Sequence, residues 1–392
     1  MKICLWLSNS FEHQYASFHL LFDLIKELQK EDSLYVIQKQ FDNGSIPDEL
    51  YSNSTAFYSF PVKKREKSNL LSRYVDDINY YLRSFKIIKN HHDIDVVFLQ
   101  SNNAPFLPIM FCSIKKIPVV YNVQDIFPNN AIYAGLLDKN SIKARLLLFL
   151  QKKAYSKAAT IITISQDMKN TICSCYDIDD SKVKVAYNWG HSNTILNNNH
   201  FSESYPKGEN EFRITYAGNI GKMQNVEIII RAAEHIDKNT NIKFYIIGDG
   251  ANKKSLETYV KEKKLSNVIF LGLQDPTAIS SVYSLSDINI IPLKKDIIYT
   301  ALPSKTADCL KEDTPLIFCI NKESNFAQKL IENRINVVDP EDSKELADTI
   351  LKMFEKKDQT NHNVLRELFL KDKSIDVYVN TLHCFEKEDR RI

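Results

Sequence analysis

Glycine is scarce in this chain, with nine in 392 residues. Long apolar runs are missing too: the best candidate for a membrane span, Ala104 to Val120, is broken by Lys115 and Lys116, and a bilayer needs ~20 apolar residues. The first apolar run is shorter than the ~7–15 residues of a signal-peptide core. We therefore expect a cytoplasmic protein, at most peripheral on the inner face of the cell membrane.

An excess of one charge is also absent, since 51 Lys and Arg stand against 49 Asp and Glu. This balance disfavours a simple basic nucleic-acid binder, so we expect no nucleic acid partner. The seven cysteines are scattered, and only Cys173 and Cys175 lie close, without a second pair at metal-ligand spacing. Reduced thiols in a cytoplasmic protein explain them.

Short apolar strand-like runs alternate with amphipathic stretches along most of the chain. This alternation predicts βαβ units and parallel sheets, and the length predicts two domains. We expect two Rossmann-like, doubly wound α/β lobes at 1–195 and 213–373, joined by a polar linker at 196–212 and followed by a helix at 374–392 that crosses back to the first lobe. Ligands of such sheets bind at the carboxyl ends of the strands, so a cleft between the lobes is the expected site.

Five of the nine glycines fall in one part of the second lobe, at the ends of strand-like runs: Gly218, Gly221, Gly248, Gly250 and Gly272. A glycine turn that leads into a helix lets backbone N–H groups approach a phosphate. The segment AGNIGK adds the charge of Lys222. The alternative, a plain tight turn, fits the spacing as well, because the segment lacks the G-x-G-x-x-G pattern.

A second candidate lies in the segment ALPSKTADCL. Pro303 stands at a plausible first helical position, with Ser304 and Lys305 in the first turn. A lysine at a helix start opposes the helix dipole, a cost that an anionic ligand would offset; the alternative is a tolerated exposed lysine. Asp308 lies one turn further, where its carboxylate could bind two ribose hydroxyls.

In the first lobe, the strand-like PVVYNV ends in Gln124 and Asp125. A carboxylate at the carboxyl end of a strand suits acid–base chemistry or substrate binding, and a turn cap for the following FPNN is the equal alternative. His13, near the first turn, is a candidate acceptor contact, although a lone histidine is more often structural.

The pairs Asp93/Asp95 and Asp177/Asp179 spell D-x-D, a pattern that can hold a metal-bound nucleotide. Both stand at strand starts, the edge opposite to the expected site, so we expect no metal there. Residues 63–89 are basic and aromatic and could lie on an anionic lipid surface, with a solvated helix face as the alternative. This segment contains Lys63, Lys64, Arg65, Lys67, Arg73, Arg83, Lys86 and Lys89 with Tyr74, Tyr80, Tyr81 and Phe85.

Five stretches in this order resemble glycosyltransferase family 4, the retaining enzymes with the GT-B fold: VQDIFPNN, ITISQDMKNTI, VKVAYNWG, ITYAGNIGKMQNVEIIIRAA with FYIIGDG, and ALPSKTADCLKEDTPLI. The likeness is greatest to the bacterial branch that builds capsule, O-antigen and exopolysaccharide units, including fucosamine-transferase-like proteins. It implies a nucleotide-sugar donor, UDP by analogy, on the second lobe, a saccharide or lipid-linked acceptor on the first, and neither a cofactor nor an essential metal.

The resemblance also implies individual roles in donor binding. Gly218, Asn219, Gly221 and Lys222 would lie along the diphosphate, Ser304 and Lys305 would meet it from the other side, Asp308 would take the ribose, and backbone near Leu273 would contact the base. The chain departs from the family where many members carry a first glutamate, which is Thr300 here, and its first loop, SNSFEHQYAS, has no glycine. The identity of the sugar therefore does not transfer.

Together these features predict a glycosyltransferase in which Lys222, Lys305 and helix N-termini stabilise the leaving diphosphate. Asp125 would orient a substrate, with Gln124 beside the acceptor. Two alternatives stay open. A non-catalytic partner subunit would explain Thr300 and the missing glycine loop, and a sugar-nucleotide epimerase shares the two-lobed plan but needs more acid–base residues than the chain offers.

Overall fold

The computed structural model describes residues 1–8, 18–40, 46–62, 70–100, 104–191, 200–237, 240–356 and 362–386. Its contacts divide the chain into two compact units, Met1–Asn188 with Lys371–Ile392, and Trp189–Leu370. We call them the N-terminal lobe and the C-terminal lobe. The division precedes the expected linker, and the described part of that linker holds helix α7 (His200–Ser204) and the first residue of a strand.

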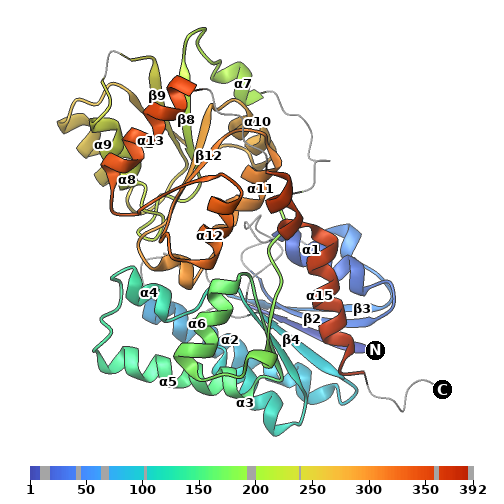
Figure 1. The fold of residues 1–392 in the computed structure, drawn as a ribbon. Coiled ribbons are helices and arrows are strands. Elements are labelled where there is room, and N and C mark those ends of the chain that lie inside the picture. Colours follow the sequence, from blue (N-terminus) through green and yellow to red (C-terminus); the bar gives the residue numbers. More distant parts are fainter. Residues whose placement is uncertain are drawn as a thin grey trace. The chain divides into compact units, whose positions relative to one another are not determined.

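The N-terminal lobe is a seven-stranded parallel sheet in the order β3-β2-β1-β4-β5-β6-β7 (Figure 1). Its strands alternate with helices, as the alternation of apolar runs and amphipathic stretches predicts. The strands are β1 (Lys2–Leu7), β2 (Ser33–Gln40), β3 (Thr55–Pro61), β4 (Val96–Gln100), β5 (Val119–Val123), β6 (Thr160–Thr163) and β7 (Val183–Val185). The helices are α1 (Phe18–Leu28), α2 (Leu70–Asn90), α3 (Phe106–Ile114), α4 (Asn129–Tyr133), α5 (Ile142–Lys157), α6 (Gln166–Tyr176) and α15 (Lys371–His383).

The C-terminal lobe repeats the plan with six parallel strands in the order β10-β9-β8-β11-β12-β13. The strands are β8 (Phe212–Ala217), β9 (Ile242–Ile247), β10 (Val268–Leu271), β11 (Ile288–Pro292), β12 (Leu316–Cys319) and β13 (Asn336–Val338). Besides α7, the helices are α8 (Glu227–Glu234), α9 (Lys253–Glu262), α10 (Ile279–Ser284), α11 (Lys305–Lys311), α12 (Asn325–Glu332), α13 (Ser343–Lys356) and α14 (Asn363–Arg366). The predicted fold class, two doubly wound α/β lobes, is confirmed.

The strands are apolar because parallel sheets are covered by helices on both faces. In the N-terminal lobe, Trp6 of β1 is fully buried and packs edge-on against Tyr81 of α2, with ring centroids 5.4 Å apart. Its indole N–H donates a 3.0 Å hydrogen bond to the hydroxyl of Ser84. This packing fixes α2 over β1.

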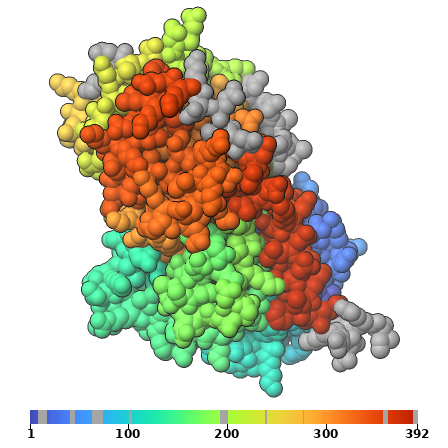
Figure 2. Space-filling view, in the orientation of Figure 1, coloured from blue at the N-terminus to red at the C-terminus, as the bar shows by residue number. Residues whose placement is uncertain are grey.

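The last described helix, α15, belongs to the N-terminal lobe and packs against α1. Figure 2 shows the two segments, dark red and blue, side by side on the surface. The hydroxyl of Tyr378 donates to the side-chain oxygen of Asn122 at the end of β5 (3.2 Å), and Lys371 pairs with Asp23 of α1 at 2.8 Å. Among the described residues, no helix combines the length and the apolarity that crossing a bilayer requires.

Candidate active site

The carboxyl edge of the C-terminal sheet is built around two glycine loops that follow β8 and β9. Gly218 and Gly248 both have positive φ angles, +142° and +137°, a region that favours glycine. A Cβ on Gly248 would stand 2.0 Å from the carbonyl oxygen of Gly218, and one on Gly250 would stand 2.4 Å from that of Ile220. These glycines are therefore required for the two loops to lie against each other at the carboxyl edge, where open α/β sheets generally bind their ligands.

Lys305 points into this edge. Its ammonium group lies 3.7 Å from the ring centroid of Tyr216, and a Cβ on Gly218 would come within 2.6 Å of it. The ammonium is buried and has no hydrogen-bond partner among the described residues. Burial lowers the pKa of Lys305 to about 7. A buried cation without a hydrogen-bond acceptor is costly, so the position favours an incoming anion.

The helix that carries Lys305 starts later than the sequence predicts. Helix α11 begins at Lys305, so Pro303 and the exposed Ser304 precede it, and the Ser304 side chain makes no capping hydrogen bond. Thr300 is fully buried and donates to the carbonyl oxygen of Ile297 (3.0 Å). Its hydroxyl therefore serves the local turn, which explains how a residue other than glutamate is accommodated there.

Asp308 is engaged by a segment that sequence reasoning missed. Its Oδ1 accepts a 2.8 Å hydrogen bond from the backbone N–H of His191, and Nδ1 of the same histidine lies 3.0 Å from Oδ2. Burial alone would raise the pKa of Asp308, but the hydrogen bonds and charge of His191, together with Lys311, outweigh burial and lower it. These two residues stand 117 positions apart, and no sequence pattern links them.

The other residues predicted to bind the donor lie in the loop after β8, except for Leu273, which follows β10. The backbone oxygen of Asn219 accepts a 2.5 Å hydrogen bond from the Tyr216 hydroxyl, and Lys222 is exposed. A Cβ on Gly221 would stand 2.7 Å from the Asn219 side chain. Leu273, after β10, is 75% exposed. An exposed leucine beside a glycine leaves the backbone open to a flat ligand, which is compatible with the expected base contact.

In the N-terminal lobe, Asp125 and Gln124 follow β5 as predicted. Burial raises the pKa of Asp125 to about 7. Gln124 is fixed between neighbours, because its amide donates to Asn122 (3.2 Å) and its oxygen accepts from Asn188 (2.7 Å). Its side chain is thus part of a polar network at this sheet edge. His13 lies outside the described residues.

The expectation that the aromatic residues of 63–89 lie on a lipid surface is wrong for Tyr80 and Tyr81 of α2. Tyr80 and Tyr81 are buried in the core, where Tyr80 donates to the backbone oxygen of Leu7 (2.7 Å). Phe85 stacks on Phe111 of α3, with ring centroids 4.4 Å apart. The aromatic residues follow the buried stripe of the helix, because β1 and α3 need apolar partners there. Residues 63–69 lie outside the described part of the chain.

The D-x-D aspartates have structural partners. Asp95 accepts from the backbone N–H of Lys2 (2.8 Å), Asp177 ends helix α6 with a φ of +57°, and Asp179 accepts from the backbone N–H of Ser181 (2.8 Å). Among the residues that the structure describes, no group of three or more His, Cys, Asp and Glu side chains is placed to hold a metal ion.

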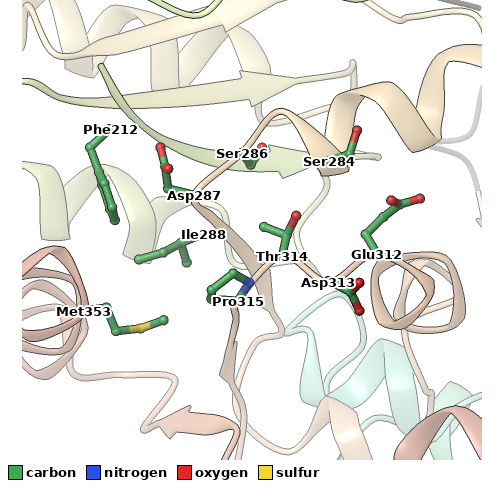
Figure 3. Close-up of a pocket in the computed structure, with 10 residues that line it drawn as sticks. All are labelled: Phe212, Ser284, Ser286, Asp287, Ile288, Glu312, Asp313, Thr314, Pro315 and Met353. Carbon is green, nitrogen blue, oxygen red and sulfur yellow. The ribbon is translucent and has the colours of Figure 1, made fainter. Parts of the chain in front are cut away.

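A cavity of about 600 Å³ lies at the opposite, amino edge of the C-terminal sheet (Figure 3). Its carboxylates already have partners: Asp287 pairs with Lys207 at 2.6 Å, Asp313 pairs with Arg366 at 2.7 Å, and Glu312 accepts from the hydroxyl of Ser280 at 2.6 Å. This cavity is separate from the glycine loops and is not the candidate active site.

Two parallel-sheet α/β lobes, one of them carrying glycine loops and a buried lysine, are the architecture of the GT-B fold, in which many glycosyltransferases are built. Comparison with known proteins agrees. Residues 20–189 match the family model "Glycosyltransferase Family 4", and residues 197–366 match "Glycosyl transferases group 1". The chain is thus a glycosyltransferase, with a region that matches the family 4 model followed by a region that matches the group 1 model.

Its relatives include other proteins named as glycosyltransferases. The chain is 25% identical over 320 residues to the "Probable glycosyltransferase WbjE" of Pseudomonas aeruginosa, covering 80% of this chain and 79% of that protein. It is 24% identical over 222 residues to WcaI of Escherichia coli K12, which is named for colanic acid biosynthesis, covering 52% and 53% of the two chains. The crystal structure of Anabaena Alr3699/HepE in complex with UDP aligns with a TM-score of 0.70 at 16% identity, over 98% of this chain and 100% of that chain.

Proposed function

We propose that the chain is a retaining enzyme that moves a sugar from a UDP-sugar to a saccharide acceptor, lipid-linked, in the synthesis of a bacterial surface polysaccharide of the fucosamine-transferase-like branch. The observation that carries the donor assignment is the Lys305 ammonium, which is buried beside Gly218 without a hydrogen-bond acceptor among the described residues. A diphosphate supplies the missing charge and acceptors. The UDP bound to the HepE structure of the same fold supports the choice of nucleotide.

In the proposed reaction, the bond between the anomeric carbon of the donor sugar and the diphosphate oxygen breaks, and the diphosphate leaves with the bonding electrons. Lys305 stabilises the charge that develops on this leaving group. The acceptor oxygen forms its bond to the anomeric carbon on the same face, and its proton passes to the leaving diphosphate. The proposal needs no metal or cofactor, since the lysine supplies the positive charge.

Asp125 is assigned a binding role in this scheme. With a pKa near 7 the carboxyl exchanges a proton at neutral pH, so it can both accept from and donate to hydroxyl groups of a saccharide. The neighbouring Gln124 is held by Asn122 and Asn188 and fixes the backbone from which Asp125 extends. We assign neither residue a covalent intermediate.

The donor assignment is tested by thermal shift with UDP, GDP, ADP, CMP and a panel of UDP-sugars. A ligand at ~100 times its Kd adds about 2.7 kcal/mol of stability, so we expect a raised melting temperature with UDP that grows with one UDP-sugar. No shift with any nucleotide would contradict the proposal and favour a non-catalytic partner subunit. Turnover of the selected donor with extracted membrane lipids, with and without EDTA, then tests the acceptor and the metal independence.

Lys305 itself is tested by substitution. Lys305→Ala should lower turnover by ~10²-fold or more, because it removes the charge that meets the leaving group. Lys254→Ala, at an exposed position of α9, serves as the control and should leave turnover unchanged. An unchanged kcat in Lys305→Ala would exclude the role of Lys305 in catalysis.

A further inference from the structure

Helix α5 exposes large apolar side chains on one face. Ile142, Leu146 and Phe149 are 85%, 56% and 57% exposed. Their spacing of four and three residues places them on the same side of the helix. The opposite face packs into the N-terminal lobe through the buried Ala144, Gln151, Ala154 and Tyr155, with Leu147 and Leu148 half-buried beside them. This helix thus carries apolar side chains on its outer face as well, whereas an ordinary surface helix keeps its apolar stripe toward the core.

The same exposed face is uniformly basic. Helix α5 contains five basic residues and no acidic one: Lys143, Arg145, Lys152, Lys153 and Lys157, all exposed. The Lys153 ammonium lies 5.5 Å from the ring centroid of Phe149. At 3.6 residues per turn, Arg145 and Lys152 flank the apolar residues on one side, and Lys143 and Lys157 flank them on the other.

Acidic residues offer these cations little compensation. Lys152 stands 3.7 Å from Asp177, but both side chains are more than half exposed, so the pair is screened and weak. A face that combines exposed apolar groups with unneutralised positive charge is complementary to a surface with an apolar interior and anionic groups at its boundary. A second copy of this chain would instead bring the same positive charge against itself.

The location of α5 suits an acceptor that is anchored in a membrane. Since α5 connects the parallel strands β5 and β6, it begins at the carboxyl edge of the sheet and returns to the amino edge. Asp125 follows β5 at that same carboxyl edge. The exposed apolar residues occupy the first half of the helix, and Figure 1 shows α5 on the outside of the lobe, next to α3.

We propose that the exposed face of α5, formed by Ile142, Leu146 and Phe149 with the flanking cations, docks on an anionic lipid bilayer. The helix lies in the plane of the interface, with its apolar side chains at the acyl boundary and its cations among the lipid phosphates. This surface differs from residues 63–89. The acceptor's lipid linkage belongs to the proposed function, whereas docking on lipid requires neither donor nor acceptor.

The test is co-sedimentation of the full chain with vesicles of phosphatidylcholine that contain one third phosphatidylglycerol, compared with pure phosphatidylcholine. We expect binding to the anionic vesicles that weakens as salt rises. Lys143→Gln with Arg145→Gln and Lys153→Gln should weaken it by roughly 100-fold, since each of the three cations near such a surface contributes about fivefold. Leu146→Ser with Phe149→Ser should also weaken it and abolish what remains at high salt.

Two matched controls test whether binding depends on the α5 face itself or only on the number of exposed apolar and basic residues in the protein. Val364→Ser with Ile331→Ser removes exposed apolar residues of the C-terminal lobe, and Lys254→Gln with Lys261→Gln removes exposed charges of α9; both should bind as the parent does. Equal binding of parent and α5 variants, or no binding to anionic vesicles, would overturn the proposal. So would a dimer of the parent that Leu146→Ser with Phe149→Ser turns into a monomer, because a second copy would then cover the face.

The outcome is independent of the donor assignment. The α5 variants should keep the melting temperature and the UDP-induced shift of the parent protein, which shows that they fold and that only lipid docking is affected. If UDP fails to stabilise any variant while vesicle binding follows the expected pattern, the proposed donor is wrong and the docking surface stands.

Discussion

The ammonium of Lys305 lies 3.7 Å from the ring centroid of Tyr216 and meets no hydrogen-bond acceptor among the described residues. A cation above an aromatic face gains some attraction, but this does not replace the hydrogen bonds that an ammonium loses on leaving water. The arrangement is therefore costly without ligand and favourable with an anion bound. Such a site lowers the stability of the free protein, and binding of the anion removes this cost.

It follows that Lys305→Met should stabilise the free protein and abolish nucleotide binding. We expect the free energy of unfolding at pH 7 to rise by about 1–3 kcal/mol, as when buried charges are replaced by apolar groups of similar size. UDP should no longer raise the melting temperature. Denaturant unfolding and calorimetric titration measure the two effects, and Lys254→Met, at an exposed position, should change neither. A destabilised Lys305→Met protein would contradict the conclusion that the buried ammonium is costly in the free protein.

The pKa of Lys305, lowered from 10.5 to about 7, makes donor affinity depend on pH. Above pH 7 the free protein holds this lysine neutral, so binding of a diphosphate must take up a proton. The Kd of UDP-glucose, whose phosphates do not titrate in this range, should rise by up to about tenfold per pH unit between pH 7 and 9. In the same window the free protein gains stability, because the unfolded chain keeps the proton that the folded chain releases. A flat pH profile would contradict the assignment, and Lys305→Met should lack the dependence.

The fold could be predicted from sequence because its signals are local. Most strands of both sheets are short runs rich in Val and Ile that stand between turn residues. Consecutive strands of a βαβ unit are usually neighbours in the sheet, so the order in the chain predicts the pairing. The glycine loops are likewise local: Gly218 and Gly248 end strands that pair directly. The sequence placed both at one edge, although their mutual steric requirement appears only in three dimensions.

That steric requirement predicts a difference between two glycines. Gly248→Ala adds a Cβ 2.0 Å from the Gly218 carbonyl oxygen at a φ of +137°, whereas nothing lies within 4 Å of a Cβ on Gly272. We expect Gly248→Ala to lower the free energy of unfolding by more than about 2 kcal/mol and to weaken UDP binding, since the two loops must separate. Gly272→Ala should change stability by less than about 0.5 kcal/mol. Similar melting temperatures for the two variants would be inconsistent with the contact between the loops.

Other parts of the site escaped prediction because their partners are distant in sequence. Helix α2 shows the same limit: its tyrosines look like surface aromatics among basic residues, yet Tyr80 and Tyr81 are required to cover β1. Asp308 was identified by its position in a motif, whereas His191, its hydrogen-bond partner, follows a different strand and offered no signal.

The pair formed by His191 and Asp308 predicts a specific acid dependence of stability. The pKa of Asp308 is lowered in the folded protein, so its contribution is present above the unfolded value of 3.8 and is lost as the pH falls through the folded value. Asp308→Asn should therefore cost about 1.5–3 kcal/mol at pH 7, and the difference from the parent protein should shrink below pH 4.

His191→Ala should remove part of the same free energy. It deletes the imidazole contact and leaves the backbone hydrogen bond of residue 191 to Asp308, so we expect a loss of about 1–2 kcal/mol at pH 7. Asp313→Asn is the matched control, because Asp313 pairs with Arg366 through a side chain that is 89% exposed, and it should change stability by less than about 0.5 kcal/mol. Denaturant unfolding of the parent and the three variants between pH 3 and pH 8 measures the effect. A cost of Asp308→Asn that stays constant down to pH 3 would mean that the carboxylate charge contributes nothing and that only the geometry of its hydrogen bonds holds the segment at His191 against α11.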